Sequence, residues 1–154
     1  KDLISNFFSG ILLIMGRSVK VGDTLEIKEM KGTVETISLR STTIKDDNGV
    51  LSNIPNSILT NNTYLQYNKK ERHRVDLTIG IGLNIDIKEF ETYILDFINR
   101  QKGILKNPKA QVFSKGINFE ESTLKISFWI KDFNKKEKYK SIITNEIRKY
   151  VNNR

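Results

Sequence analysis

The sequence predicts an α+β fold in three consecutive parts: a short helix in residues 3–16, a small strand-rich part in residues 23–68, and a mixed part that follows a polar joint at residues 68–71. Three patterns predict it. The first part has apolar residues at helical spacing, the second has short alternating segments separated by tight turns, and the third alternates strand-like with helix-like segments. Apolar residues make up 38% and charged residues 29% of the 154 positions, an ordinary balance for a folded chain.

Residues 3–16 predict the N-terminal helix. Its small residues, Ser5, Ser9 and Gly10, would allow another helix to approach closely. A helix this apolar must be covered, and since the downstream region has amphipathic helices of its own, we expect lipid or subunit contact rather than burial in a core. The stretch is too short to span a bilayer, which takes about 20 apolar residues. The apolar stripe comprises Leu3, Phe7, Ile11, Ile14 and Met15.

Residues 23–68 predict several short strands arranged as a small bent barrel. Asn48-Gly49 is a strong hairpin signal between two of them. Pro55 cannot donate to a strand ladder and should end its strand, after which Asn56 should cap a helical turn. Gly22 and Gly32 suit tight turns in which a side chain would clash.

The third part begins with a strand predicted at residues 73–80. Asp86, followed by Glu89 three residues later, predicts a capped helix start, and Gly103 predicts the helix stop. Two further strands are predicted at 110–113 and 123–130, then a final amphipathic helix over residues 139–151. The order β-α-β-β-α is that of a ferredoxin-like plait without its last strand.

The chain lacks the residue types that most catalytic and metal sites need. It has no cysteine, which excludes disulfides and thiolate chemistry, and a single histidine, His73, which excludes a multi-histidine metal site. It also has no Gly-x-Ser-x-Gly elbow and no phosphate-binding glycine loop. We therefore expect no enzyme activity, no catalytic residue, no cofactor and no metal, with His73 a surface strand residue.

Net charge is +8, and the excess lies late in the chain, with +3 in residues 104–131 and +4 in residues 132–154. Such an excess can attract nucleic acid, an acidic membrane surface or anions along a path. Its simpler interpretation is a solvated, lysine-rich face.

One block, RSTTIKDDNGVLSNIPN at residues 40–56, together with the preceding Gly-x-Val and Val-Gly-Asp steps, resembles the small-conductance mechanosensitive channel family of bacterial inner membranes. The resemblance runs from Leu3 to about Trp129, with departures at Ser18-Val19, Gln66 and Leu83-Asn84 that affect fine packing. The positions that match the family pattern are Asn6, Gly10, Leu13, Arg17, Gly22, Asp23, Gly32, Val34, Ile37, Arg40, Thr42, Ile44, Gly49, Ile54, Pro55 and Asn56.

The resemblance implies that residues 1–16 are the lower half of the pore-lining third transmembrane helix. Residues 17–68 would be an Sm-like β-domain, and residues 69–154 a ferredoxin-like α/β domain whose C-terminal barrel strand is absent. Seven identical subunits would enclose a vestibule on the cytoplasmic side of the inner membrane. Tension would open the pore to ions and small solutes during hypo-osmotic shock, with lipid as a partner and no nucleic acid expected.

The resemblance also implies roles for particular residues. Gly10 takes the position of a hinge in the pore helix, and Asn6 takes a position that approaches the region of Ser57 in an inactivated arrangement. The motif positions expected to be structural are Arg17, Gly22, Asp23, Gly32, Arg40, Pro55 and Asn56. Candidates for charge along the vestibule are Lys135, Lys136, Lys138 and Lys140.

Two other functions remain open from the residues alone. A basic chain with a small barrel fits an Sm-like or OB-like nucleic-acid-binding module, although the barrel region carries little net charge and offers only Tyr64 and Tyr67 for base stacking. The chain could also be a plain assembly module that tethers a membrane protein.

Overall fold

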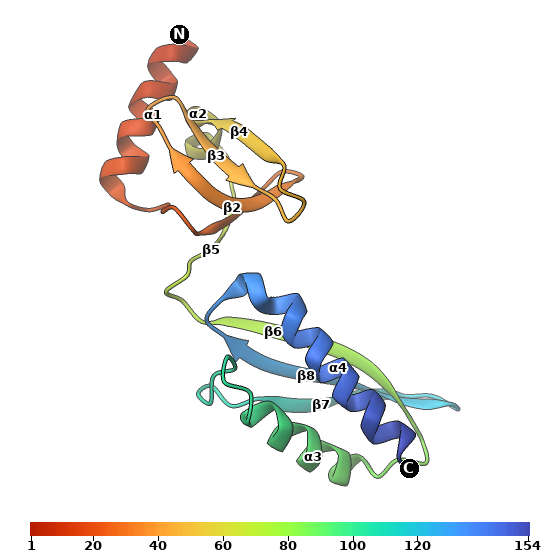
Figure 1. Cartoon of the computed structure of the whole chain (residues 1–154). Coiled ribbons are helices and arrows are strands. Elements are labelled where there is room, and N and C mark those ends of the chain that lie inside the picture. The colour runs from red at the N-terminus through yellow and green to blue at the C-terminus, as the bar shows by residue number, and fades with distance from the viewer. The chain divides into compact units, whose positions relative to one another are not determined.

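The computed structural model describes residues 1–154, which form two compact units, residues 1–71 and residues 72–154. Figure 1 shows the N-terminal helix with the first sheet in one unit and a sheet covered by two long helices in the other. The mixed α+β class predicted from the sequence is confirmed. Each unit has its own hydrophobic core.

Helix α1, Asp2–Gly16, confirms the predicted N-terminal helix. Its packed face is not the apolar stripe but the face that carries Ser9, Gly10 and Leu13, all three of which are buried. The large side chains elsewhere on the helix stay exposed within this chain, including Leu12 at 65% and Met15 at 78%. Ser9 and Gly10 are small, so they let the helix axis come close to Leu39 and Asn56.

The first unit contains one antiparallel sheet of five strands in the order β4-β3-β2-β1-β5, and a short helix follows β4. Strands β4 and β5 are the two edges of this sheet and do not pair with each other. In a closed barrel the two edge strands would be hydrogen-bonded to each other. The elements are β1 Thr24–Ile27, β2 Met30–Ile37, β3 Ser41–Lys45, β4 Leu51–Pro55, α2 Asn56–Asn61 and β5 Leu65–Tyr67.

Alternation along these strands explains the core of the first unit. Side chains of successive strand residues point to opposite faces, so every second residue can be buried. The β2–β3–β4 pairing follows this rule, since Val34 is opposite Ile44 and the next strand contributes Ile54. The predicted hairpin turn is confirmed: Gly49 has φ +81°, a conformation that glycine adopts readily. The buried cluster comprises Leu13, Val19, Leu25, Ile27, Val34, Ile44, Ile54 and Leu59.

The second unit is a three-stranded antiparallel sheet, in the order β6-β8-β7, with both long helices packed on one face. The even-numbered residues of β8 from Leu124 to Ile130 are fully buried and belong to the same core cluster as Phe90 of the first helix and Ile143 of the second. The elements are β6 His73–Gly82, α3 Ile87–Asn99, β7 Gln111–Ile117, β8 Glu121–Ile130, the 3-10 turn Phe133–Lys135 and α4 Lys136–Asn152.

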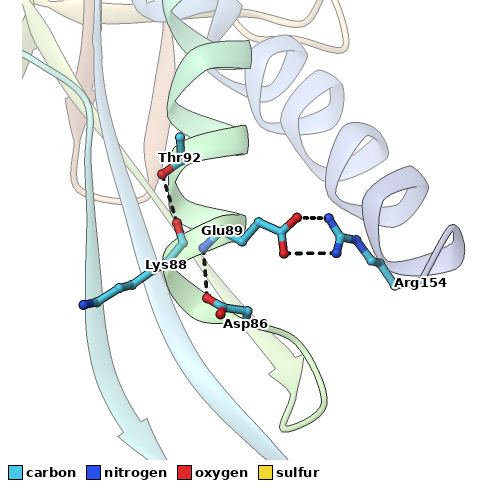
Figure 2. A network of polar contacts seen from close by, with 5 residues as sticks. All are labelled: Asp86, Lys88, Glu89, Thr92 and Arg154. Atoms are coloured by element: carbon cyan, nitrogen blue, oxygen red, sulfur yellow. Dashed lines mark hydrogen bonds and ion pairs between the residues drawn. The ribbon is translucent and has the colours of Figure 1, made fainter.

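The start of α3 is capped as predicted, because the Asp86 carboxylate accepts the backbone N–H of Glu89 at 3.0 Å. The Glu89 carboxylate does not complete a reciprocal capping box. Figure 2 shows it turned instead to the guanidinium of Arg154, which holds it through both oxygens and joins the end of the chain to α3. This hydrogen bonding raises the pKa of Arg154.

The prediction that Gly103 ends a helix is wrong, since α3 ends at Asn99 and Gly103 lies in the loop beyond it. Its lack of a side chain serves packing, because a Cβ built on Gly103 would overlap the hydroxyl of Tyr139. Among the helices, none is both long and apolar enough to cross a membrane.

Candidate functional site

Helices α1 and α2 meet along a polar seam that contains the gating-related positions predicted from the sequence. The backbone N–H of Ser57, at the start of α2, donates to the side-chain oxygen of Asn6 at 3.0 Å. The structure therefore brings together Asn6 and Ser57, two residues separated by 51 positions. Since this N–H is among the first of α2 and has no partner within its helix, Asn6 satisfies a donor that would otherwise need water.

Gly10 lies one turn further along α1, and it is buried in the same seam. A Cβ built at this position would overlap the carbonyl oxygen of Leu39, and would lie 2.6 Å from Nδ2 of Asn56 and 2.8 Å from the carbonyl carbon of Leu39. Two of these neighbours are backbone atoms that cannot rotate away. The α1 helix runs without interruption through Gly10, so in this arrangement its missing side chain permits a close approach.

A second side-chain contact joins the two helices beside Gly10. The hydroxyl of Ser9 lies 2.9 Å from the hydroxyl of Thr60. Sequence reasoning noted Ser9 only as a small residue and missed Thr60, because a pairing between two hydroxyls on separate helices leaves no local pattern.

Asn56 is fully buried and connects three segments of the first unit. Its side-chain oxygen accepts from the Thr42 hydroxyl at 2.9 Å, its amide donates to the Ser38 carbonyl at 2.8 Å, and its backbone N–H donates to the Arg40 carbonyl at 3.0 Å. The prediction that Asn56 caps α2 is wrong: Pro55 occupies the N-cap and Asn56 is the first helical residue. Its side-chain oxygen, the atom that a cap would use to accept an α2 backbone N–H, accepts from Thr42 of β3 instead.

The segment after α1 turns sharply before entering β1. Arg17 ends the helix in a left-handed conformation, φ 49°, and Gly22 makes the predicted turn at φ +94°. Asp23 is buried, and its carboxylate accepts from the backbone N–H of Lys20 at 3.0 Å and from the side-chain amide of Gln66 at 2.9 Å. Gln66 thus ties this turn to β5, a role that the sequence did not reveal.

Gly32 is not at a turn, contrary to the prediction. It lies within β2, where a Cβ would come 2.7 Å from the carbonyl oxygen of Lys45. The predicted clash is therefore present, but it arises between neighbouring strands. Arg40 and Pro55 line an open depression beside Asn6, together with Leu39 and residues of the strand ends.

The four candidate lysines lie elsewhere, at the 3-10 turn and the start of α4 in the second unit. Two of them have intramolecular neighbours, since Lys135 lies 3.8 Å from the Asp132 carboxylate and the Lys136 ammonium lies 5.6 Å from the centre of the Phe133 ring. Their proximity along the chain places four cations on one short segment. Whether they face an ion path stays a prediction.

The two tyrosines offered for base stacking are both half-buried. The Lys31 ammonium lies 5.4 Å from the centre of the Tyr67 ring, and the Tyr67 hydroxyl donates to Glu26 at 3.4 Å. Burial, together with that carboxylate, raises the pKa of Tyr67. The ring therefore serves contacts within its own sheet, which does not favour the nucleic-acid hypothesis.

Comparison with known proteins places these features in a family context. The family model described as the β-domain of the mechanosensitive ion channel matches residues 2–69, a stretch that includes α1, the five-stranded sheet and α2. An uncharacterized MscS family protein of Aquifex aeolicus is 31% identical over 147 residues, covering 93% of this chain and 39% of the relative. The small-conductance mechanosensitive channel of Helicobacter pylori is 28% identical over 131 residues, covering 85% and 48%. The chain thus spans less than half the length of these relatives.

Solved structures agree with the sequence matches. The crystal structure of Helicobacter pylori MscS in a closed state is similar with a TM-score of 0.80 at 25% identity, over 96% of this chain and 58% of that chain. The cryo-EM structure of Arabidopsis thaliana MSL1 is similar in fold, with a TM-score of 0.72 at 17% identity, over 95% and 55%. The predicted mixed α+β class is confirmed by this likeness, while the Sm-like and ferredoxin-like subdivision stays a prediction.

Proposed function

We propose, because the chain belongs to the MscS family of mechanosensitive channels, that it forms the cytoplasmic vestibule portion of a tension-gated channel in a bacterial inner membrane. The channel would release ions and small solutes during hypo-osmotic shock. One observation carries the proposal: the family match at residues 2–69 includes helix α1 as well as the sheet. Helix α1 and the sheet therefore belong to one matched stretch of the family's β-domain.

The exposed side of α1 supports an assembly of several subunits. Leu3, Ile4, Phe8, Leu12 and Met15 are between 60% and 78% exposed in the single chain, and apolar patches of this kind mark contact with protein or lipid. We propose that neighbouring copies of α1 and lipid cover them around a pore, in a homoheptamer. Residues 1–16 would then continue a pore-lining helix, and residues 17–154 would form the wall of the vestibule.

The seam between α1 and α2 would make the gating-related contact. With Asn6 bonded to Ser57 and Gly10 close to the Leu39 carbonyl, α1 packs against α2 and the loop before β3. We propose that this docked arrangement is an inactivated state, and that release of α1 from the seam precedes a new opening. Gly10 would allow both the close packing of α1 against Leu39 and the bending of the pore helix.

A chimera tests the proposal directly. This chain would replace the corresponding part of the Helicobacter pylori channel in bacteria that lack their own mechanosensitive channels. We expect tension-activated currents in membrane patches, survival of hypo-osmotic shock, and a purified mass equal to seven subunits. A chimera that reaches the membrane intact but gives no tension-activated current would contradict the proposal, and the unmodified Helicobacter channel serves as the control.

Charge reversal at Lys135, Lys136, Lys138 and Lys140 predicts a change in ion preference. If these lysines lie near the permeation path, replacing all four by glutamate should shift the reversal potential in asymmetric salt towards cation preference. The effect should be largest in dilute salt. The field of a charge is screened beyond about 8 Å at physiological ionic strength, and it reaches further in dilute solution. Replacing the same four by arginine keeps the charge and should leave the reversal potential unchanged. An equal reversal potential for both variants in dilute salt would place the segment away from the path.

A further inference from the structure

We propose that the hydroxyl pair of Ser9 and Thr60 is a latch that fixes α1 on α2 and sets how long the docked arrangement lasts. Its consequence for a channel rests on the proposed function, while the latch itself is a property of this chain. The pair consists of Ser9 Oγ and Thr60 Oγ1 at 2.9 Å, and Ser9 is 7% exposed. Neither residue belongs to the motif positions through which the chain resembles its family, so the family pattern does not specify the contact.

The geometry shows why a second contact matters. Asn6 bonds to Ser57 and Ser9 bonds to Thr60, and both pairs are separated by 51 positions. A step of three residues along α1 therefore matches a step of three residues along α2, so the two helices run in the same direction along the seam. Residues three apart on a helix lie on one face. One contact alone would leave α1 able to pivot about it, whereas two contacts about one turn apart fix its direction.

Gly10 makes the latch reachable. It follows Ser9 directly and lets α1 approach until its backbone meets Leu39 and Asn56. A bulkier residue at this position would hold the helices apart, and a hydroxyl pair at 2.9 Å cannot tolerate a further separation of 1 Å. The seat at Gly10 and the Ser9–Thr60 contact should therefore form and break together.

The chemistry of the pair suits a reversible contact. The Thr60 hydroxyl also lies 3.3 Å from the carbonyls of Asn56 and Ser57, so it can donate within α2 while it accepts from Ser9. When α1 undocks, Thr60 keeps these local acceptors and Ser9 gains water. Because both groups remain satisfied when apart, we expect loss of the contact to change the docking equilibrium only about 3- to 10-fold, the usual net effect of a neutral hydrogen bond.

Hydrogen exchange on the 154-residue chain tests the latch without a channel. An isolated helix as short as α1 is marginal in water, so exchange of its central amides reports undocking. Ser9→Ala and Thr60→Val should each accelerate that exchange roughly 3- to 10-fold, and the double variant should match the larger single effect, since all three remove the same hydrogen bond. Thr60→Ser keeps the hydroxyl and should leave exchange unchanged.

Ser5→Ala is the matched control, because Ser5 lies on the same helix but is exposed. Single variants that exchange no faster than Ser5→Ala, or a double variant whose effect is the product of the two singles, would overturn the latch. Recordings from the chimera separate this outcome from the proposed function. Faster exchange with faster recovery from inactivation supports both, whereas faster exchange with unchanged recovery supports the latch and contradicts its role in inactivation.

Discussion

Gly10→Ala is expected to release α1 from its seat and shift the docking equilibrium about 5- to 150-fold towards the undocked helix. The physical reason is overpacking, which typically costs about 1–3 kcal/mol when the neighbours cannot move. Here the added methyl would overlap the Leu39 carbonyl oxygen and crowd the Asn56 amide, and the first of these is fixed in the backbone. Alanine also favours the helical state by about 1 kcal/mol over glycine, so the released α1 should remain helical more readily than the original helix.

Gly16→Ala is the control for this prediction. Gly16 is the last residue of the same helix, and a Cβ built there meets no atom within 4 Å. It should leave docking unchanged, as measured by the rate at which a cysteine introduced at the buried position 13 reacts with a thiol reagent. In the chimera, Gly10→Ala should weaken inactivation while leaving opening by tension largely intact. Unchanged labelling and unchanged inactivation in Gly10→Ala would show that the seat is not needed.

Asn56→Ala is expected to lower the free energy of unfolding of the first unit by about 2–4 kcal/mol. The substitution leaves the buried Thr42 hydroxyl without a partner, which costs about 1–3 kcal/mol. Loss of the part-buried bond to the Ser38 carbonyl adds about 1 kcal/mol. The total stability of a domain is only about 5–15 kcal/mol, so this is a large fraction. The loop that seats Gly10 should loosen with it, because Ser38 and Arg40 both bond to Asn56.

Urea unfolding followed by hydrogen exchange in β3 and β4 would measure this loss. Trp129, the single tryptophan, lies on β8 in the second unit and provides a separate fluorescence probe there. Asn53→Ala is the matched control, because Asn53 also accepts from a β3 hydroxyl, that of Thr43 at 2.6 Å, but the contact is exposed to solvent. It should cost less than about 1 kcal/mol. Equal losses for the two asparagines would contradict the connecting role assigned to Asn56.

The order and type of nearly all elements, and the family, could be predicted from residue patterns alone. These features depend on neighbours in the chain: helical spacing for α1, Asn48-Gly49 for the hairpin, Pro55 for the end of β4 and Asp86 for the cap of α3. Backbone preferences and the spacing of apolar residues depend on only a few neighbouring positions, so they can be recognised without knowing the fold. The α1–α2 approach was also foreseen at Asn6 and Ser57, through resemblance to the family.

The packed face of α1 and the contacts of several small or polar residues could not be predicted from the sequence, because they depend on how distant segments pack together. An apolar stripe predicts that a helix must be covered, but the packed face carries Ser9, Gly10 and Leu13. The Leu39 backbone comes too close to position 10 for any larger side chain there, while Leu13 joins the hydrophobic core. Asn56 was expected to cap its own helix and instead bonds to Thr42 and Ser38. Such contacts join segments from 14 to 51 positions apart. Their partners are set by how the sheet and helices pack, and no local pattern records that.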